Sequence, residues 1–161
     1  MILLNIAVFG GCYPDKEYEE KVYNLFKEKF INKDINIITC GTVGTIEAVC
    51  KATKENGLKN IATSLNKWEN YINKYIDETH LFDNELDRLK YITNISDMYI
   101  VLDGDIGTFE ELFVVLEITQ DIDKPIYLLG NKVKNALDML IANEVITDKV
   151  LDRFMYVDLI K

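Results

Sequence analysis

The sequence predicts one doubly wound α/β domain that spans residues 1–161 and contains a mostly parallel sheet flanked by helices. Two observations lead to this fold class. Short, continuous apolar runs alternate with longer amphipathic segments, which is typical of a parallel sheet covered by helices on both faces. A chain of 161 residues is also long enough for one sizeable core and short for two.

The first half of the chain supplies three predicted strands and two predicted helices. The strand candidates are the apolar runs "ILLNIAVFG", "INIITCG" and "KNIATSL". Between them, "DKEYEEKVYNLFKEKFI" repeats apolar side chains at helical spacing, and "GTIEAVCKATKENG" predicts a helix that closes on a glycine. Residues 65–84 are polar and aromatic without a clean period, so we expect a long loop there, with room for a short strand.

The second half continues the alternation. "NELDRLKYITNIS" predicts a helix capped by Asp83 or Asn84. A fourth strand, "DMYIVLDG", leads into the helix "TFEELFVVLEITQ", and a fifth strand, "KPIYLLG", leads into "KVKNALDMLIAN". The run "RFMYVDL" is the candidate for a last strand or an edge of the sheet.

The composition limits the partners and the compartment. Asp and Glu number 27 against 18 Lys and Arg, and the net charge of −9 repels phosphate backbones and anionic lipids. We therefore expect neither nucleic acid nor a membrane as a partner. The N-terminus lacks the features of a signal peptide. The cysteines Cys12, Cys40 and Cys50 have no metal-like spacing, so we expect buried free thiols in a cytoplasmic protein without a metal or cofactor.

Three glycine-bearing loops, "FGGCYPD", "CGTVGTIE" and "LDGDIGTFEE", follow the first, second and fourth predicted strands. In a doubly wound sheet, ligands bind outside the carboxyl ends of the strands, where such loops converge. Two of the loops lead into helix N-termini, whose free N–H groups favour an anion. We expect a small nucleotide or nucleoside, bound by Gly10, Gly11, Gly41, Thr42, Gly44, Thr45, Glu47, Asp103, Gly104, Asp105, Gly107 and Thr108.

The third loop is rich in acids for a strand-to-helix turn. Acids suit a ligand that presents sugar hydroxyls, and a carboxylate held beneath an anomeric carbon stabilises the oxocarbenium-like transition state of glycosidic cleavage. Asp103 and Asp105 suit sugar hydroxyls better than a phosphate. The loop is therefore predicted to hold a ribose, with any phosphate near Arg88 or the second loop.

The third loop and its surroundings resemble the signature of the "Lonely guy" (LOG) proteins, long labelled possible lysine decarboxylases, of a Rossmann-like superfamily. The matches to their pattern P-G-G-x-G-T-x-x-E are Gly104, Gly107, Thr108 and Glu111. Asp103 replaces the proline and Asp105 the second glycine, while Arg88 matches an arginine on the preceding helix. The second loop is similar to G-G-x-x-G-x-M-E-A-V, with matches at Gly41, Gly44, Glu47, Ala48 and Val49. The resemblance spans about residues 2–130.

The resemblance implies an activity and a catalytic pair. Active LOG proteins cleave the N-glycosidic bond of nucleoside 5′-monophosphates, releasing the free base and ribose 5-phosphate, and are often dimers. It implies that Glu111 and Arg88 are catalytic here and that the glycine-threonine loops hold the phosphate. Other relatives in the superfamily bind nucleotide-derived signals without turning them over, so a non-catalytic binding module is an alternative.

A second resemblance leaves another alternative open. Nucleoside 2-deoxyribosyltransferases carry D-x-G-T-x-x-E after a strand, and Asp105, Gly107, Thr108 and Glu111 reproduce that spacing. This pattern implies transfer of a deoxyribosyl group between bases. Arg88 and the second loop belong to the first pattern, and both resemblances imply chemistry at a C–N glycosidic bond.

The same residues have structural interpretations. Thr108 and Glu111 form T-x-x-E before an apolar run, which is the pattern of a capping box. Arg88 can pair with Glu85 or Asp87 on a solvated helix face. The glycines of the third loop can serve only a tight turn that needs positive φ, and Glu47 can complement a helix dipole. Three aromatic residues can cover the pocket as a lid, although core packing is the expected role: Trp68, Tyr71 and Tyr75.

Apolar side chains on the two central helices indicate self-association. The helix that carries Arg88 and the helix after Glu111 are apolar on more than one face. The residues concerned are Tyr91, Ile92, Phe113, Val114 and Leu116. One sheet face does not need so many, so we predict a homodimer with a two-fold interface.

Overall fold

Seven strands form one parallel sheet in the computed structural model, which describes residues 2–161 apart from the side chains of residues 157–159. The spatial order is β4-β3-β2-β1-β5-β6-β7, and all six pairings are parallel. The strands are β1 (Leu4–Phe9), β2 (Ile35–Thr39), β3 (Lys59–Leu65), β4 (Glu78–Phe82), β5 (Met98–Val101), β6 (Ile126–Gly130) and β7 (Phe154–Ile160).

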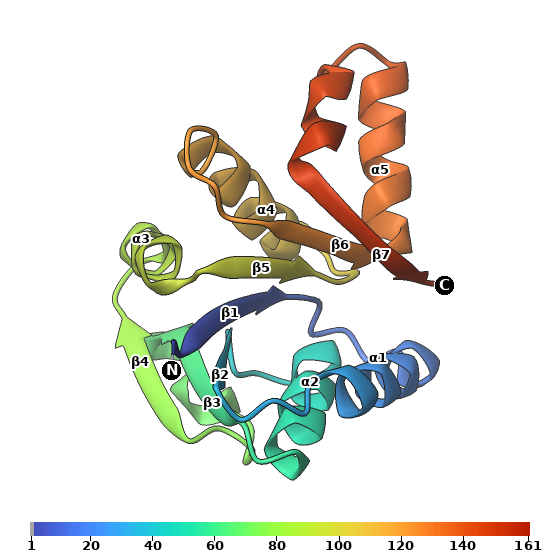
Figure 1. The fold of residues 1–161 in the computed structure, drawn as a ribbon. Coiled ribbons are helices and arrows are strands. Elements are labelled where there is room, and N and C mark those ends of the chain that lie inside the picture. The colour runs from blue at the N-terminus through green and yellow to red at the C-terminus, as the bar shows by residue number, and fades with distance from the viewer. Residues whose placement is uncertain (1) are drawn as a thin grey trace.

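Helices cover both faces of the sheet, as the sequence predicts (Figure 1). They are α1 (Lys16–Lys29), α2 (Thr45–Glu55), α3 (Glu85–Ile95), α4 (Ile106–Ile118) and α5 (Asn131–Ala142), with two 3₁₀ turns, η1 (Asn66–Tyr71) and η2 (Asp148–Arg153). One apolar cluster joins α1 and α2 to the sheet, and a second joins α3, α4 and α5 to its other face. The doubly wound α/β fold is confirmed.

The strand order reverses between β1 and β5. The chain runs outward from β1 to β4, returns through α3 to β5, and then runs outward in the other direction. Phe9 pairs with Val101, so the loops after β1 and β5 start side by side. The Gly11 N–H donates to the Asp103 carbonyl at 3.0 Å. Such a reversal opens a crevice at the carboxyl ends of the strands, which is where ligands bind in this class of fold.

The segment predicted as a long loop is more ordered than its composition indicates. Residues 66–71 form η1, and residues 78–82 form the edge strand β4. β4 is only half-buried, because a strand at the edge of a sheet has a neighbouring strand on one side and solvent on the other. It therefore does not need the continuous apolar run by which the central strands were predicted. Of the two predicted caps of α3, Asn84 holds the position, since its Oδ1 accepts from the Asp87 N–H at 3.0 Å.

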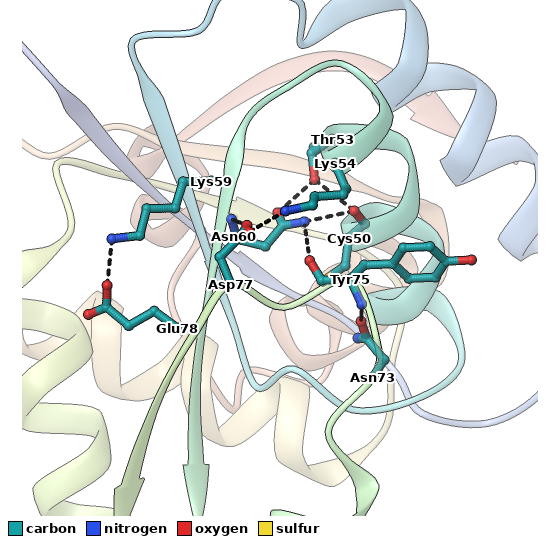
Figure 2. A network of polar contacts seen from close by, with 9 residues as sticks. All are labelled: Cys50, Thr53, Lys54, Lys59, Asn60, Asn73, Tyr75, Asp77 and Glu78. Atoms are coloured by element: carbon teal, nitrogen blue, oxygen red, sulfur yellow. Dashed lines mark hydrogen bonds and ion pairs between the residues drawn. The ribbon is translucent and has the colours of Figure 1, made fainter.

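A buried amide fixes this segment against α2. The Asn60 side chain accepts from the Thr53 hydroxyl at 2.7 Å and donates to the carbonyls of Cys50 and Tyr75 (Figure 2). Further along, the Asn73 side chain donates to the carbonyls of Gly41 and Thr42 at 3.0 and 2.9 Å. The segment that follows η1 therefore holds the loop after β2 in place.

Candidate functional site

A cavity of about 330 Å³ opens at the carboxyl ends of the central strands. Its volume is at the lower end of the roughly 300–1,000 Å³ that small-molecule sites occupy. It is lined by Gly10, Gly11, Cys12, Cys40, Thr42, Val43, Ser64, Leu65, Trp68, Tyr71, Glu85, Arg88, Asp105, Gly107, Thr108 and Glu111. All three glycine-bearing loops contribute, and so do η1 and the helices α3 and α4.

At the inner end of the cavity, Arg88, Glu85 and Glu111 form what we call the buried charge cluster. Arg88 is 5% exposed and Glu111 6%. The Arg88 Nη2 lies 2.6 Å from Glu85 Oε1 and 3.2 Å from Glu111 Oε2, and its Nη1 donates to the Thr63 carbonyl at 3.2 Å. The expected pairing with Glu85 is present, but not on a solvated face. The structure brings the predicted catalytic pair into direct contact.

Burial and charge set the protonation of this cluster. Burial raises the pKa of Glu111 above its ordinary value, and the nearby Arg88 guanidinium opposes that rise. Burial disfavours the charge of Arg88, but the carboxylates of Glu111 and Glu85 outweigh it and raise the pKa of Arg88. Burial also raises the pKa of the Cys40 thiol, with the Glu111 charge adding to the effect. Cys40 is therefore a neutral thiol beside the Arg88–Glu111 pair.

Glu111 is positioned by α4 and does not cap it. The helix begins at Ile106 with Asp105 as its N-cap residue, so Thr108 is already the third helical residue. The capping-box interpretation is wrong for this reason. Residues three and four apart share a helix face, so Gly107 and Thr108 lie on the same face as Glu111 and line the cavity with it.

The two glycines of the third loop have different roles. A Cβ on Gly104 would lie 1.9 Å from the Thr108 hydroxyl and 2.9 Å from the Gly11 nitrogen, so this position excludes any side chain. A Cβ on Gly107 would meet nothing within 4 Å, although Gly107 lines the cavity. Neither Gly104 nor Gly107 has a positive φ, so the interpretation that they serve a tight turn with positive φ is wrong for both.

Four predicted contact residues of the second loop shape the wall and do not line the cavity. Gly41 and Gly44 have φ of +72° and +74°, and a Cβ on Gly44 would lie 2.8 Å from the Cys12 backbone. The Thr45 N–H donates to the Gly11 carbonyl at 3.1 Å. Glu47, the fourth, is half-buried on the first turn of α2. The loop reaches the cavity instead through Thr42, and the loop after β1 does so through Gly10 and Gly11.

The acids of the third loop point to different places. Asp103 does not line the cavity, because its Oδ1 accepts from the Val133 N–H at 3.0 Å and so caps α5. Its own N–H donates to the Tyr18 hydroxyl at 2.8 Å, and burial raises the pKa of its carboxyl. Asp105 lines the cavity and is exposed. A hydrogen bond from the Tyr13 hydroxyl to Asp105, together with the Asp105 charge, raises the pKa of Tyr13.

An aromatic pair, which we call the aromatic rim, stands at the cavity. The rings of Trp68 and Tyr71 lie 5.6 Å apart at 68° to each other, and the two side chains are 44% and 56% exposed. The expected core packing is therefore wrong for these two residues. Both belong to η1, in the segment where the sequence shows no period. A 3₁₀ segment of six residues is too short to produce one.

Sequence reasoning did not assign six of the lining residues to the site: Cys12, Cys40, Val43, Ser64, Leu65 and Glu85. Cys40 directly follows β2, and Cys12 lies in the loop three residues after the end of β1, so their place after a strand was the available signal. All three cysteines are free thiols, but only Cys50 is buried, so the expected burial is wrong for Cys12, which is exposed. In the part of the chain that the structure describes, no cluster of His, Cys, Asp and Glu is arranged to hold a metal ion. None of the described helices is long and apolar enough to cross a membrane.

A family model matches most of the chain. The model described as "Possible lysine decarboxylase" matches residues 44–160, which include the second loop from Gly44 onward, the third loop and the buried charge cluster. The sequence comparison with curated proteins finds no match.

Solved structures share the fold at low sequence identity. The molybdenum cofactor binding protein of the phototrophic bacterium Rippkaea orientalis is 18% identical with a TM-score of 0.77, covering 99% of this chain and 91% of its own. The molybdenum cofactor carrier protein of Chlamydomonas reinhardtii is 16% identical with a TM-score of 0.71, covering 98% and 91%. DNA processing protein A of Streptococcus pneumoniae is 14% identical with a TM-score of 0.64, covering 98% of this chain and 59% of its own.

Proposed function

The chain belongs to the family described as possible lysine decarboxylases, and on that premise we propose that it hydrolyses the N-glycosidic bond of a nucleoside 5′-monophosphate or a related nucleoside. The products are the free base and the sugar or sugar phosphate. The observation that carries the proposal is the contact between Arg88 and Glu111 at the inner end of a cavity built by the glycine-bearing loops.

Glu111 stabilises the positive charge that develops as the bond to the base breaks. Departure of the base leaves an oxocarbenium-like sugar, and a fixed carboxylate close to the anomeric carbon lowers the energy of that state. Arg88 keeps Glu111 oriented and, through its charge, opposes protonation of the buried carboxyl. The pair therefore supplies a carboxylate that is both buried and fixed, as this chemistry requires.

The other lining residues suit the two ends of a nucleoside. The carboxylate of Asp105, at the N-terminus of α4, accepts hydrogen bonds from sugar hydroxyls. The aromatic rim offers a face on which a planar base stacks. Gly107 leaves open space, so a sugar approaches the first turn of α4 closely. Asp105 thus binds the sugar, which is the role that the sequence predicts for it.

The test is release of free base. The protein is incubated with adenosine, guanosine, cytidine, uridine and their 5′-monophosphates, and free base is followed by chromatography. Release from at least one substrate, lost in Glu111→Gln, supports the proposal. Intact substrates throughout would contradict it.

Glycosyl transfer is a second candidate, because all four residues of the D-x-G-T-x-x-E pattern line the cavity: Asp105, Gly107, Thr108 and Glu111. In this case the sugar would pass to a second base and not to water. Deoxynucleosides are then the better substrates, and adding a second base accelerates release of the first. Measuring release from deoxyadenosine with and without added hypoxanthine separates transfer from hydrolysis.

A binding module is a third candidate, and the structure of the charge cluster favours it. Glu111 is already neutralised by Arg88 in the absence of ligand, which is compatible with a site that only holds its ligand. Two of the structural relatives are described as a molybdenum cofactor binding protein and a molybdenum cofactor carrier protein. Tight binding of a nucleotide without base release would support this candidate.

We also propose that the chain forms a homodimer through the outer surface of α3 and α4. Ile92 packs into the core, but Phe113 and Ile118 on α4 and Leu86 on α3 are exposed. Burying these apolar side chains in a two-fold interface removes them from water. Light scattering at micromolar concentration tests this proposal, and a monomer would contradict it.

A further inference from the structure

We infer that the cavity selects a nucleoside that carries no 5′-phosphate. The inference rests on the proposed N-glycosidic function and names the substrate class of the same site. A phosphate needs an unpaired cation or a free helix N-terminus. The cavity presents three candidates of these kinds: Arg88, the N-terminus of α2 and the N-terminus of α4. In each of them the structure places a contact or a charge that disfavours a dianion.

Arg88 is already engaged by carboxylates. Its Nε and Nη2 both donate to Glu85, its Nη2 also donates to Glu111, and its Nη1 donates to the Thr63 carbonyl. Of the five N–H donors of a guanidinium, four are used. A phosphate would have to displace carboxylates that sit 2.6 and 3.2 Å from the guanidinium in a buried place. Displacement would leave those carboxylates without their partner, which is strongly unfavourable.

The N-terminus of α2 is covered by the loop after β1. Gly44, its N-cap residue, packs against the backbone of Cys12, where an added Cβ would lie 2.8 Å away. The Thr45 N–H, the first of the helix, donates to the Gly11 carbonyl at 3.1 Å. A phosphate cannot reach a donor that is paired and overlaid by another backbone segment. The second loop, where the sequence allows a phosphate, thus does not offer this donor to an anion.

The N-terminus of α4 opens to the cavity but carries its own acid. Asp105 is the N-cap residue, and its side chain makes no capping hydrogen bond. Its carboxylate is exposed beside the Tyr13 hydroxyl. A phosphate here would face a carboxylate across a short distance, and like charges so placed repel each other and weaken binding. Sugar hydroxyls, in contrast, donate hydrogen bonds to the same oxygens.

The net charge of the lining agrees with these local contacts. Among the described residues that line the cavity, Arg88 is the one cationic side chain, against the carboxylates of Glu85, Glu111 and Asp105. Lys67 lies close to the rim, with its Nζ 5.2 Å from the Trp68 ring centroid, but it is outside the lining. The lining is therefore anionic around a space of about 330 Å³, which suits a small neutral ligand.

The experiment compares each nucleoside with its own 5′-monophosphate, using the whole chain. Adenosine, guanosine, cytidine, uridine and inosine are titrated calorimetrically, each beside its monophosphate, and base release is followed in parallel. We expect at least one nucleoside to bind at least tenfold more tightly than its monophosphate. The difference should shrink as salt is added, because added ions screen the repulsion at the exposed Asp105.

Two variants show whether Asp105 sets the preference. Asp105→Asn removes the charge and keeps a residue that caps helices equally well, so the fold is retained. We expect it to shift the ratio of nucleoside to monophosphate affinity by roughly tenfold toward the monophosphate. Glu117→Gln removes a charge from the exposed part of the same helix, outside the cavity, and should leave that ratio unchanged.

The outcomes separate the substrate class from the reaction. Nucleoside binding without base release supports the inference and contradicts the proposed hydrolysis. Base release from monophosphates, with equal or tighter monophosphate binding, upholds hydrolysis and overturns the inference. Absence of binding by any of the ten compounds overturns the inference as well. An equal shift of the affinity ratio in Asp105→Asn and Glu117→Gln would show that Asp105 does not set the preference for nucleosides, and would overturn its assignment as the residue that excludes the phosphate.

Discussion

At the inner end of the cavity, the carboxylates of Glu85 and Glu111 converge on Arg88, whereas at its mouth the carboxylate of Asp105 is exposed beside Tyr13. The chemical group is the same in both places, but the surroundings differ. The inner acids are tied to one partner and largely removed from water, so the fold depends on them. The outer acid has no capping bond to maintain, so it is available to a ligand.

The largest effect on stability is expected when the inner acids lose their partner, Arg88. Arg88→Ala removes the partner of two buried or half-buried carboxylates and should lower the free energy of unfolding by about 3–5 kcal/mol. Asp105→Ala should lower it by less than about 1 kcal/mol, because the side chain makes no capping hydrogen bond. Urea denaturation measures both. Equal losses in the two variants would contradict the distinction between inner and outer acids.

The two glycines of the third loop also separate a residue that the fold needs from one that is available to a ligand. Gly104→Ala places a methyl group against the Thr108 hydroxyl and the Gly11 backbone, and such overpacking costs about 1–3 kcal/mol. Gly107→Ala meets open space and should retain full stability, yet weaken ligand binding because the methyl group projects into the cavity region. Thermal melts and calorimetric titration measure the two effects. A stable Gly104→Ala protein would remove the packing argument.

Much of the site could be predicted because its residues follow strands. Gly10, Gly11 and Thr42 come from loops at the carboxyl ends of predicted strands, and those ends share one edge in a parallel sheet. Thr108 lies in the first turn of the helix that follows such a loop. The fold class follows from the same alternation of apolar runs and amphipathic segments. The family resemblance supplied the Arg88–Glu111 pair, which periodicity alone cannot relate across 23 positions.

Other features could not be predicted because they depend on tertiary contacts. Asp103 lies in the same acidic loop as Asp105, yet its carboxylate accepts a hydrogen bond from α5. The sequence around Asp103 does not show that α5 packs beside this loop. The aromatic rim lies in a 3₁₀ segment too short to show a period, and tertiary hydrogen bonds of Asn66 and Asn73 fix its two ends. The helix α4 begins at Ile106, two residues before its predicted start at Thr108, so Thr108 is not the N-cap residue and the predicted capping box does not form.

Removing the tryptophan of the aromatic rim should affect binding and not folding. Trp68→Ala takes away a stacking surface, and stacking of a base on an aromatic side chain contributes about 1–3 kcal/mol. Tyr156→Ala is the control, since Tyr156 is 46% exposed and lies outside the cavity. Calorimetric titration with the tightest nucleoside measures the loss. Unchanged affinity in Trp68→Ala would show that the base does not lie at the rim.

The smallest effect is a dependence of stability on pH. Because burial raises the pKa of Glu111 in the folded state, its protonated form is favoured there, and its contribution to stability is complete below pH 4.5. That contribution is lost as the pH rises through the raised pKa. The melting temperature of the native chain should therefore fall relative to that of Glu111→Gln above pH 4.5. A constant difference between the two proteins across this range would contradict the raised pKa.

The central claim is that the Glu111 carboxylate stabilises glycosidic cleavage within the cavity. The most direct measurement compares single-turnover base release by the native chain and by Glu111→Gln, each saturated with the same bound nucleoside. We expect the variant to bind that nucleoside with nearly unchanged affinity and to release base about 10²–10⁴-fold more slowly, since it lacks the charge that the transition state needs. Equal rates of base release in the two proteins would contradict the claim.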